Sequence, residues 1–104
     1  MHYHISGSSK PAPAGGHVLT ARVNHTTFEW LGPIGSPHRA VWKGCHEAVR
    51  DARARGLKSI TIHTRNAVVR NQATGSWNRH KMVLDKHVRK FRRLTRGMTV
   101  AWAP

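Results

Sequence analysis

The chain has very few acidic residues. Its 104 residues include 4 Asp and Glu, which are Glu29, Glu47, Asp51 and Asp85. A phosphodiester-cutting site of the two-metal kind needs clustered carboxylates to hold Mg²⁺ against phosphate. So few carboxylates leave little material for such a cluster, and the composition weighs against an enzyme of this class.

Cysteine and long apolar runs are also scarce. Cys45 is the single cysteine, so an internal disulfide is excluded and a reducing compartment is permitted. The chain has no run of about 18 consecutive apolar residues, and its start, Met-His-Tyr-His-Ile, does not form a charged region followed by an apolar stretch. We therefore expect a soluble cytoplasmic protein with no cleaved leader and no membrane anchor. If the chain is phage-encoded, that compartment is the host cytoplasm.

Positive charge is what the chain has in abundance. Lys and Arg number 18, and the formal net charge is +14 before any of the 9 His is protonated. Binding a polyanion relieves the self-repulsion of so small a body. Nucleic acid is the expected polyanion, ahead of an anionic membrane surface and an acidic protein surface. The alternative is a soluble protein that is merely basic.

The length fits one domain, residues 1–104. A chain of this size buries about 60 to 68 % of the surface that it exposes when unfolded. Hydrophobic residues at 38 %, spread along the chain with 4 Trp, suffice for a modest core. We therefore expect a folded domain.

The first third of the chain has strand patterns. His2–Ser6 alternates in polarity, and a Gly, Ser and Pro-rich segment, 7–16, predicts a bend. Two β-rich runs follow, 17–23 and 27–34, separated by the short polar connection 24–26. This pattern predicts three strands before any helix, the last two of them an antiparallel hairpin.

A helix should begin at Pro37. Ser36 offers an N-cap oxygen, Pro37 has the dihedral angle of a first helical position, and Gly56 ends the helix. One apolar face, formed by Val41, Cys45, Ala48 and Ala52, should lie on the sheet.

The second half alternates strands and helices. Residues 57–64 predict a strand, Asn66 begins a brief helix through about Gln72 that Gly75 ends, 81–95 predict a long helix, and 98–103 predict a last strand. The buried stripe expected for the long helix consists of Leu84, Val88, Phe91 and Leu94. The whole pattern is typical of an α/β fold.

This order of elements resembles that of the ribonuclease H fold, and several segments agree with it locally. The matching segments are 5–8 (ISGS), 39–42 (RAVW), 60–66 (ITIHTRN), 68–77 (VVRNQATGSW), 91–93 (FRR) and 100–104 (VAWAP). The resemblance covers nearly the full chain. It implies a five-stranded mixed sheet whose first three strands are antiparallel, with helices packed on it and without the family's C-terminal helix.

The resemblance also implies that the metal site of the family is lost. The family's first Asp corresponds to Ser6, its Glu to Val41 and its second Asp to Arg65, and a fourth acidic residue would lie beyond Pro104. We therefore expect no catalytic residue, no metal and no cofactor. The pair Pro37-His38 stands where the family has two Asn that contact ribose hydroxyls.

Four positions on or near the short helix could contact nucleic acid. Arg65 either binds a backbone phosphate through its planar guanidinium or is a solvated charge. Asn71 and Gln72 lie at the helix edge that faces the substrate groove in the family, where amides can bind 2′-hydroxyls. They could instead form an ordinary polar helix surface. Trp77 could stack on a base or cover the core.

The last helix has a basic stripe with Asp85 as its only acid. Its members are Arg79, Lys81, Lys86, Arg89, Lys90, Arg92, Arg93 and Arg96. A solvated helix normally mixes charges of both signs, so the stripe favours a phosphate-binding surface. Neutralising about 5 to 8 phosphates would make the affinity fall steeply with salt.

Several histidines deserve comparison with a metal site. His2 and His4 share one face of the first strand, and His63 and His80 could lie near the position of the family's metals. No Cys pair and no helical spacing of four accompanies them, so zinc is not expected.

These features predict a catalytically inactive protein that binds an RNA/DNA hybrid or double-stranded RNA by shape and backbone. The alternative is a scaffold or inhibitor that binds an acidic protein partner, with weak, salt-insensitive nucleic-acid binding. A third interpretation is residual cleavage through His4 or His63. A homodimer or another chain could cover the sheet surface left by the absent C-terminal helix.

Overall fold

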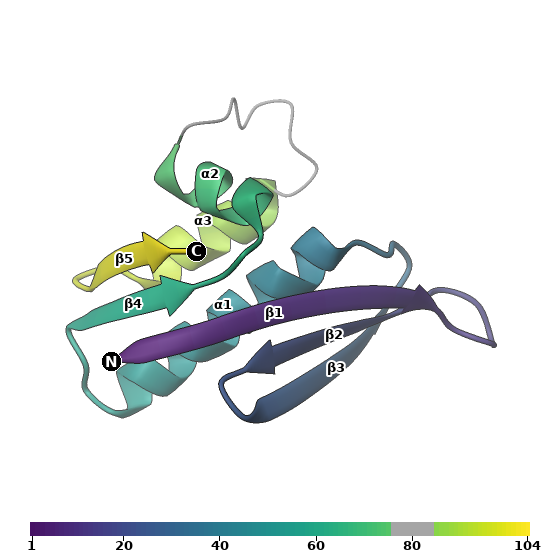
Figure 1. Cartoon of the computed structure of the whole chain (residues 1–104), viewed down its shortest axis with the longest axis horizontal. Coiled ribbons are helices and arrows are strands. Elements are labelled where there is room, and N and C mark those ends of the chain that lie inside the picture. The colour runs from purple at the N-terminus through teal and green to yellow at the C-terminus, as the bar shows by residue number, and fades with distance from the viewer. Residues whose placement is uncertain (76–84) are drawn as a thin grey trace.

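The computed structural model of the chain describes residues 1–75 and 85–104. Its elements are β1 (His2–Pro11), β2 (His17–Val23), β3 (Thr26–Gly32), α1 (Pro37–Ala54), β4 (Ser59–His63), α2 (Ala67–Thr74), α3 (Asp85–Leu94) and β5 (Thr99–Ala103) (Figure 1). The strands form one sheet in the order β3-β2-β1-β4-β5. β1, β2 and β3 pair antiparallel, while β4 pairs parallel with β1 and β5. The predicted mixed sheet is confirmed.

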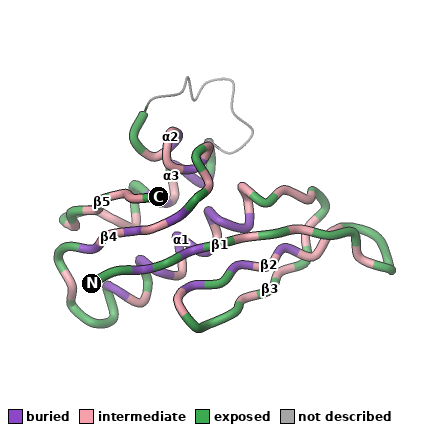
Figure 2. The backbone as a smooth tube through the Cα atoms, viewed as in Figure 1, coloured by how far each residue is buried: buried purple, intermediate pink, exposed green. Residues whose placement is uncertain are grey.

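α1 and α3 cover one face of the sheet and lie behind it in the view of Figure 1. The alternation of burial along β1 follows from this arrangement, because successive side chains of a strand point to opposite faces. Tyr3 and Ile5 are buried, whereas His2, His4 and Ser6 are exposed (Figure 2). The second face of β1 is thus polar.

The core centres on Trp42 of α1, which is fully buried. Its ring makes edge contacts with Phe91 of α3 and Trp102 of β5, at centroid distances of 5.5 and 6.1 Å. The predicted apolar face of α1 is buried, as are Val88 and Phe91 of the predicted α3 stripe. Leu94 is partly buried, and Leu84 lies outside the described residues.

A capping side chain begins each of the helices α1 and α2. Ser36 Oγ accepts a hydrogen bond from the Arg39 N–H at the start of α1, and Asn66 Oδ1 accepts one from the Val69 N–H, at 3.0 Å, at the start of α2. Gly75 ends α2 in the left-handed region at φ 80°. No helix of the described residues is long and apolar enough to cross a membrane.

The bend predicted at 7–16 is wrong in its first half, because β1 continues to Pro11. Pairing with β2 carries the strand through this Gly and Ser-rich segment, from Gly7 opposite Ala21 to Pro11 opposite His17. The turn itself is confined to 12–16, where the Ala12 N–H donates to the Gly16 carbonyl. Tertiary pairing overrides the weak strand propensity of these residues.

Other boundaries shift by a few residues. β3 ends at Gly32 and not at Ile34, and β4 spans Ser59–His63 and not 57–64. α3 is described from Asp85, so the predicted start at Lys81 lies outside the described residues.

Gly7 is a point of close approach between β1 and α1. A Cβ at this position would lie 2.7 Å from the backbone nitrogen of Val41 and 2.9 Å from the Ala40 Cβ. Backbone atoms cannot yield as a flexible side chain can, so the strand and the helix would have to separate. Glycine is required here for packing and not for a turn.

We predict that Gly7→Ala lowers the free energy of unfolding by about 1 to 3 kcal/mol, because it overpacks this contact. Urea unfolding of the variant and the parent measures the difference. Ser8→Ala, on the next and exposed position of the same strand, is the matched control and should change stability by less than about 0.5 kcal/mol. Equal unfolding midpoints for Gly7→Ala and the parent would contradict the close approach.

Candidate nucleic-acid interface

A cleft of about 570 Å³ opens beside β1, where β2, the first turn and a half of α1 and the end of β4 converge. Ser6, Val41 and Arg65 all line it. These three positions are far apart in sequence, and the structure brings them together as the resemblance implied. We call this site the cleft.

The chemistry of the cleft is cationic. Arg22 and Arg65 line it together with His4 and His63, and no Asp or Glu side chain is among its described lining residues. Val41 is an alkyl side chain with 2 % exposure, whereas Ser6 and Arg65 are exposed. Guanidinium groups repel Mg²⁺ and offer a planar set of donors to phosphate oxygens.

The turn that carries Arg65 is held by hydrogen bonds on both sides. The Thr64 N–H donates to the Ala103 carbonyl at 2.9 Å, and the Arg70 guanidinium donates to the Thr64 carbonyl at 2.5 Å. Asn66 contacts the His38 ring on α1, with 2.8 Å between Asn66 Nδ2 and His38 Nδ1. The backbone of Arg65 is therefore fixed, while its exposed side chain extends toward solvent.

Three histidines gather at the edge of the cleft. His2 Nδ1 lies 2.7 Å from His63 Nε2, and the rings of His4 and His63 stack at a centroid distance of 4.4 Å. Desolvation, followed by the charge that His4 and His2 would carry, lowers the pKa of His63. In the described residues no group of three or more His, Cys, Asp or Glu is arranged to hold a metal ion. His80 lies outside the described residues.

Gln72 has a packing role in place of the groove contact that we expected for it. It is only 3 % exposed, and its Oε1 accepts a hydrogen bond from Trp42 Nε1 at 2.8 Å. Its neighbour Asn71 is partly exposed on the same helix. The sequence does not predict this role, because a polar residue near a helix end is usually exposed. Only the packing of Trp42 against α2 shows that the Gln72 amide is buried.

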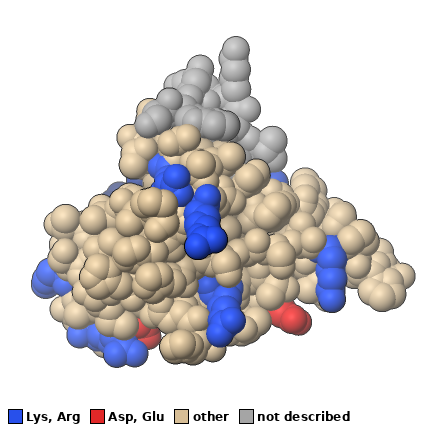
Figure 3. Space-filling model, in the orientation of Figure 1, with Lys and Arg blue, Asp and Glu red and all other residues tan. Residues whose placement is uncertain are grey.

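The basic stripe is described in part. Lys86, Arg89, Arg92, Arg93 and Arg96 are exposed and Lys90 is partly buried, whereas Trp77, Arg79 and Lys81 lie outside the described residues. Figure 3, in the orientation of Figure 1, shows the sheet side of the molecule, where separate Lys and Arg side chains are spread with little acidic surface between them.

A second hollow, of about 480 Å³, lies between α1 and α3 and shares no lining residue with the cleft. Its lining residues are Lys43, His46, Lys86, His87, Arg89, Lys90 and Arg93. The structure thus gathers four members of the predicted stripe and adds three residues that sequence reasoning missed. In the sequence, Lys43, His46 and His87 are only basic and histidine residues on two predicted helices. No local pattern indicates that these two helices pack together. We call this site the α1/α3 hollow.

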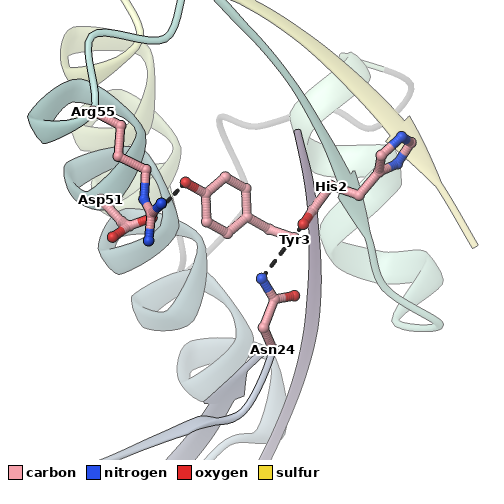
Figure 4. A network of polar contacts seen from close by, with 5 residues as sticks. All are labelled: His2, Tyr3, Asn24, Asp51 and Arg55. Carbon is pink, nitrogen blue, oxygen red and sulfur yellow. Dashed lines mark hydrogen bonds and ion pairs between the residues drawn. The ribbon is translucent and has the colours of Figure 1, made fainter.

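Two of the few carboxylates have structural roles on α1. Asp51 accepts from the Tyr3 hydroxyl at 2.6 Å and from Arg55 Nε at 2.8 Å (Figure 4), and Glu47 pairs with Arg50. The hydrogen bond from Tyr3 lowers the pKa of Asp51, while burial and this same bond raise the pKa of Tyr3. Neither carboxylate lines the cleft or the α1/α3 hollow.

Solved structures of ribonuclease H domains are similar to the whole chain. RNase H1 from the halophilic archaeon Halobacterium salinarum superposes with a TM-score of 0.64 at 17 % identity, over 100 % of this chain and 84 % of that chain. The N-terminal RNase H domain of a Mycobacterium tuberculosis protein, solved as a fusion with maltose-binding protein, gives a TM-score of 0.66 at 17 % identity, over 99 % and 82 %. A foamy viral protease-reverse transcriptase in complex with double-stranded DNA gives 0.54 at 16 % identity, over 99 % and 80 %.

These similarities, together with the strand order, show that the fold is ribonuclease H-like. No protein-family model matches the chain, and no curated protein is similar to it in sequence. Fold alone does not determine activity, so function has to be argued from the residues of the sites.

We predict that Gln72→Leu lowers the free energy of unfolding by about 1 to 3 kcal/mol, because it leaves the buried Trp42 N–H without an acceptor. Thermal unfolding measures the loss. Asn71→Ala on the same helix is the control, with an expected change within about 0.5 kcal/mol. A Gln72→Leu variant as stable as the parent would show that this hydrogen bond contributes nothing to the free energy of unfolding.

We also predict that stability falls as the pH is lowered from about 6.5 to about 4. Burial lowers the pKa of His46 and of His87 to about 4, whereas the unfolded chain protonates histidine near a pKa of about 6.5. Between these values the unfolded state binds more protons, so acidification to about pH 4 favours unfolding, by at most about 3 kcal/mol for each of the two histidines. Urea unfolding at about pH 7, 5.5 and 4.5 measures the slope.

Two variants sharpen this measurement. His46→Gln keeps a donor for the His87 carbonyl, which His46 Nε2 contacts at 3.0 Å, and should reduce the slope. His25→Gln, in the exposed turn between β2 and β3, should leave it unchanged. A free energy of unfolding that stays constant over the window would contradict the burial of neutral imidazoles.

Proposed function

We propose that this protein binds nucleic acid without cleaving it, through the cleft and the basic surface of α3. The observation that carries the proposal is the convergence of Ser6, Val41 and Arg65 in one cleft whose described lining has no Asp or Glu side chain. A two-metal hydrolase needs anionic ligands that hold two metal ions about 4 Å apart, and a hydroxyl, an alkyl group and a guanidinium cannot replace these ligands.

The cleft is suited to an anion instead of a cation. The Arg65 side chain is exposed above a backbone fixed by the β4–α2 turn, and Arg22 lines the same cleft. Two guanidinium groups near one phosphate can bind its oxygens directly and take the place that metal ions have in a nuclease. The charge of +14 makes such an encounter fast and salt-dependent.

We infer that the preferred ligand is an A-form or mixed duplex, either an RNA/DNA hybrid or double-stranded RNA. The wide, shallow minor groove of these duplexes is recognised through phosphates and 2′-hydroxyls more than through bases. The partly exposed Asn71 on α2 remains a candidate for hydroxyl contacts. Lys86, Arg89, Lys90 and Arg93 on α3 are the candidates for additional phosphate contacts.

We predict that the protein binds a labelled RNA/DNA hybrid or RNA duplex more tightly than duplex DNA or single strands, with an affinity that falls steeply with salt. Neutralising about 5 to 8 phosphates gives a slope of about −4 to −7 for the logarithm of the binding constant against that of the salt concentration. Fluorescence anisotropy at two or more salt concentrations measures both quantities, and the hybrid should remain intact when Mg²⁺ or Mn²⁺ is added.

Arg65→Ala tests the cleft in the same assay. Removing one charge-assisted contact should weaken hybrid binding by about 10-fold at low salt and reduce the salt slope by about 1. Arg55→Ala is the matched control, because Arg55 lies about 21 Å further along the axis of α1 than Val41 and lines neither site. Equal affinities for the two variants would remove Arg65 from the interface.

Other results would overturn the proposal itself. Weak and salt-insensitive binding to all four nucleic acids would contradict it and favour an acidic protein partner. Cleavage of the hybrid that requires Mn²⁺ and disappears in His63→Ala would contradict the non-catalytic assignment and favour a histidine-based site at the edge of the cleft.

A further inference from the structure

The α1/α3 hollow is lined entirely by nitrogen-bearing side chains. Five are Lys or Arg and two are His, and no carboxylate is among the described residues that line it. It lies on the helical side of the molecule and shares no residue with the cleft. A concave site of this composition is complementary to an anion.

The cations of the hollow repel one another. Burial, followed by the charges of Lys90 and Lys86, lowers the pKa of Lys43. The Lys43 ammonium lies 5.3 Å from the centre of the Trp30 ring, which provides some compensation but no counter-charge. The nearby Glu47 is already paired with Arg50. The repulsion between these like charges raises the free energy of the folded protein, and a bound anion would lower it.

His87 provides an independent sign of a missing partner. The residue is 7 % exposed, and its Nε2 is buried with no hydrogen-bond partner in the described part of the chain. A buried polar atom without a partner costs about 1 to 3 kcal/mol and is uncommon in native proteins. The adjacent His46 differs, because its Nε2 donates to the His87 carbonyl at 3.0 Å. This buried ring thus forms part of the wall of the cationic hollow.

We propose that the α1/α3 hollow binds a phosphate group, with Lys43 and Lys90 balancing its charge and the His87 ring in the wall beside it. Phosphate fits the site better than a single carboxylate, because its several oxygens can accept from several donors at once. The inference deepens the proposed function, which already assigns phosphate contacts to α3, and it rests on that function for the source of the phosphate, the backbone of a bound nucleic acid. It makes these α3 contacts part of a concave site that also includes Lys43 and His87.

The test is a nuclear magnetic resonance titration of the full chain that follows the histidine ring signals. Inorganic phosphate is added at constant ionic strength, with chloride as the balancing ion. We expect a saturable shift of the His87 ring and a rise of its pKa from about 4 by about 1 to 3, because an anion close to the ring favours its protonated form. The exposed His25 ring serves as the internal control.

Variants separate a built site from general charge attraction. Lys43→Ala should weaken phosphate binding by about 10-fold, as expected for loss of one charged contact. Lys58→Ala removes the same charge at an exposed position outside the hollow, and should leave phosphate binding unchanged. Equal effects of the two variants would overturn the site. These measurements do not depend on a His87 variant, which could fail to fold.

Further arms of the titration identify the source of the phosphate. A hybrid duplex should move the His87 ring in the same direction as inorganic phosphate, and acetate should not move it. Duplex binding by anisotropy with an unmoved His87 ring would overturn the hollow and leave the proposed function standing. A saturable response to phosphate without duplex binding would support the hollow and contradict the proposed function. A response to acetate as strong as that to phosphate would overturn the phosphate assignment.

Discussion

The close packing of α1 against β1 and α3 is the contact on which the rest of this structure depends. Gly7 lets α1 approach β1 so closely that a Cβ would meet the Val41 backbone, and Trp42 then fills the space beside α3 and β5. The same stretch of helix presents Val41 to the cleft and Lys43 to the α1/α3 hollow. Because successive helical residues point in fixed directions, positioning α1 also positions one wall of each site.

The distribution of charge follows from how the few carboxylates are used. Asp51 and Glu47 are engaged with neighbours on α1, so they do not neutralise the cations of the cleft or the hollow. Positive charge is therefore concentrated at two concave surfaces whose described lining includes no Asp or Glu side chain. The lowered pKa of Lys43 is one consequence of this arrangement. A protein selected only to fold would gain by mixing the charges, and this distribution favours a function that requires a polyanion.

Elements with local signals could be predicted, and those that depend on a partner could not. Ser36 as an N-cap and Asn66 as a turn residue predicted the starts of α1 and α2, and both side chains cap their helices, because capping satisfies backbone donors within a few residues. The extension of β1 to Pro11 had no such signal, since it requires the hydrogen bonds that β2 supplies. Gln72 shows the same limit for a side chain, because its amide is buried only once Trp42 is packed against it.

By itself the sequence determined which chemical groups this protein has and which it lacks: no carboxylate at positions 6, 41 and 65, a net charge of +14 and a single cysteine. It also indicated the order of strands and helices, because periodicity and capping are local properties. Only the tertiary structure decided which groups meet. It joined Ser6, Val41 and Arg65 in one cleft and buried His87 in the wall of a second site. Such convergence depends on contacts between elements distant in the chain, and no local pattern encodes the burial that those contacts produce.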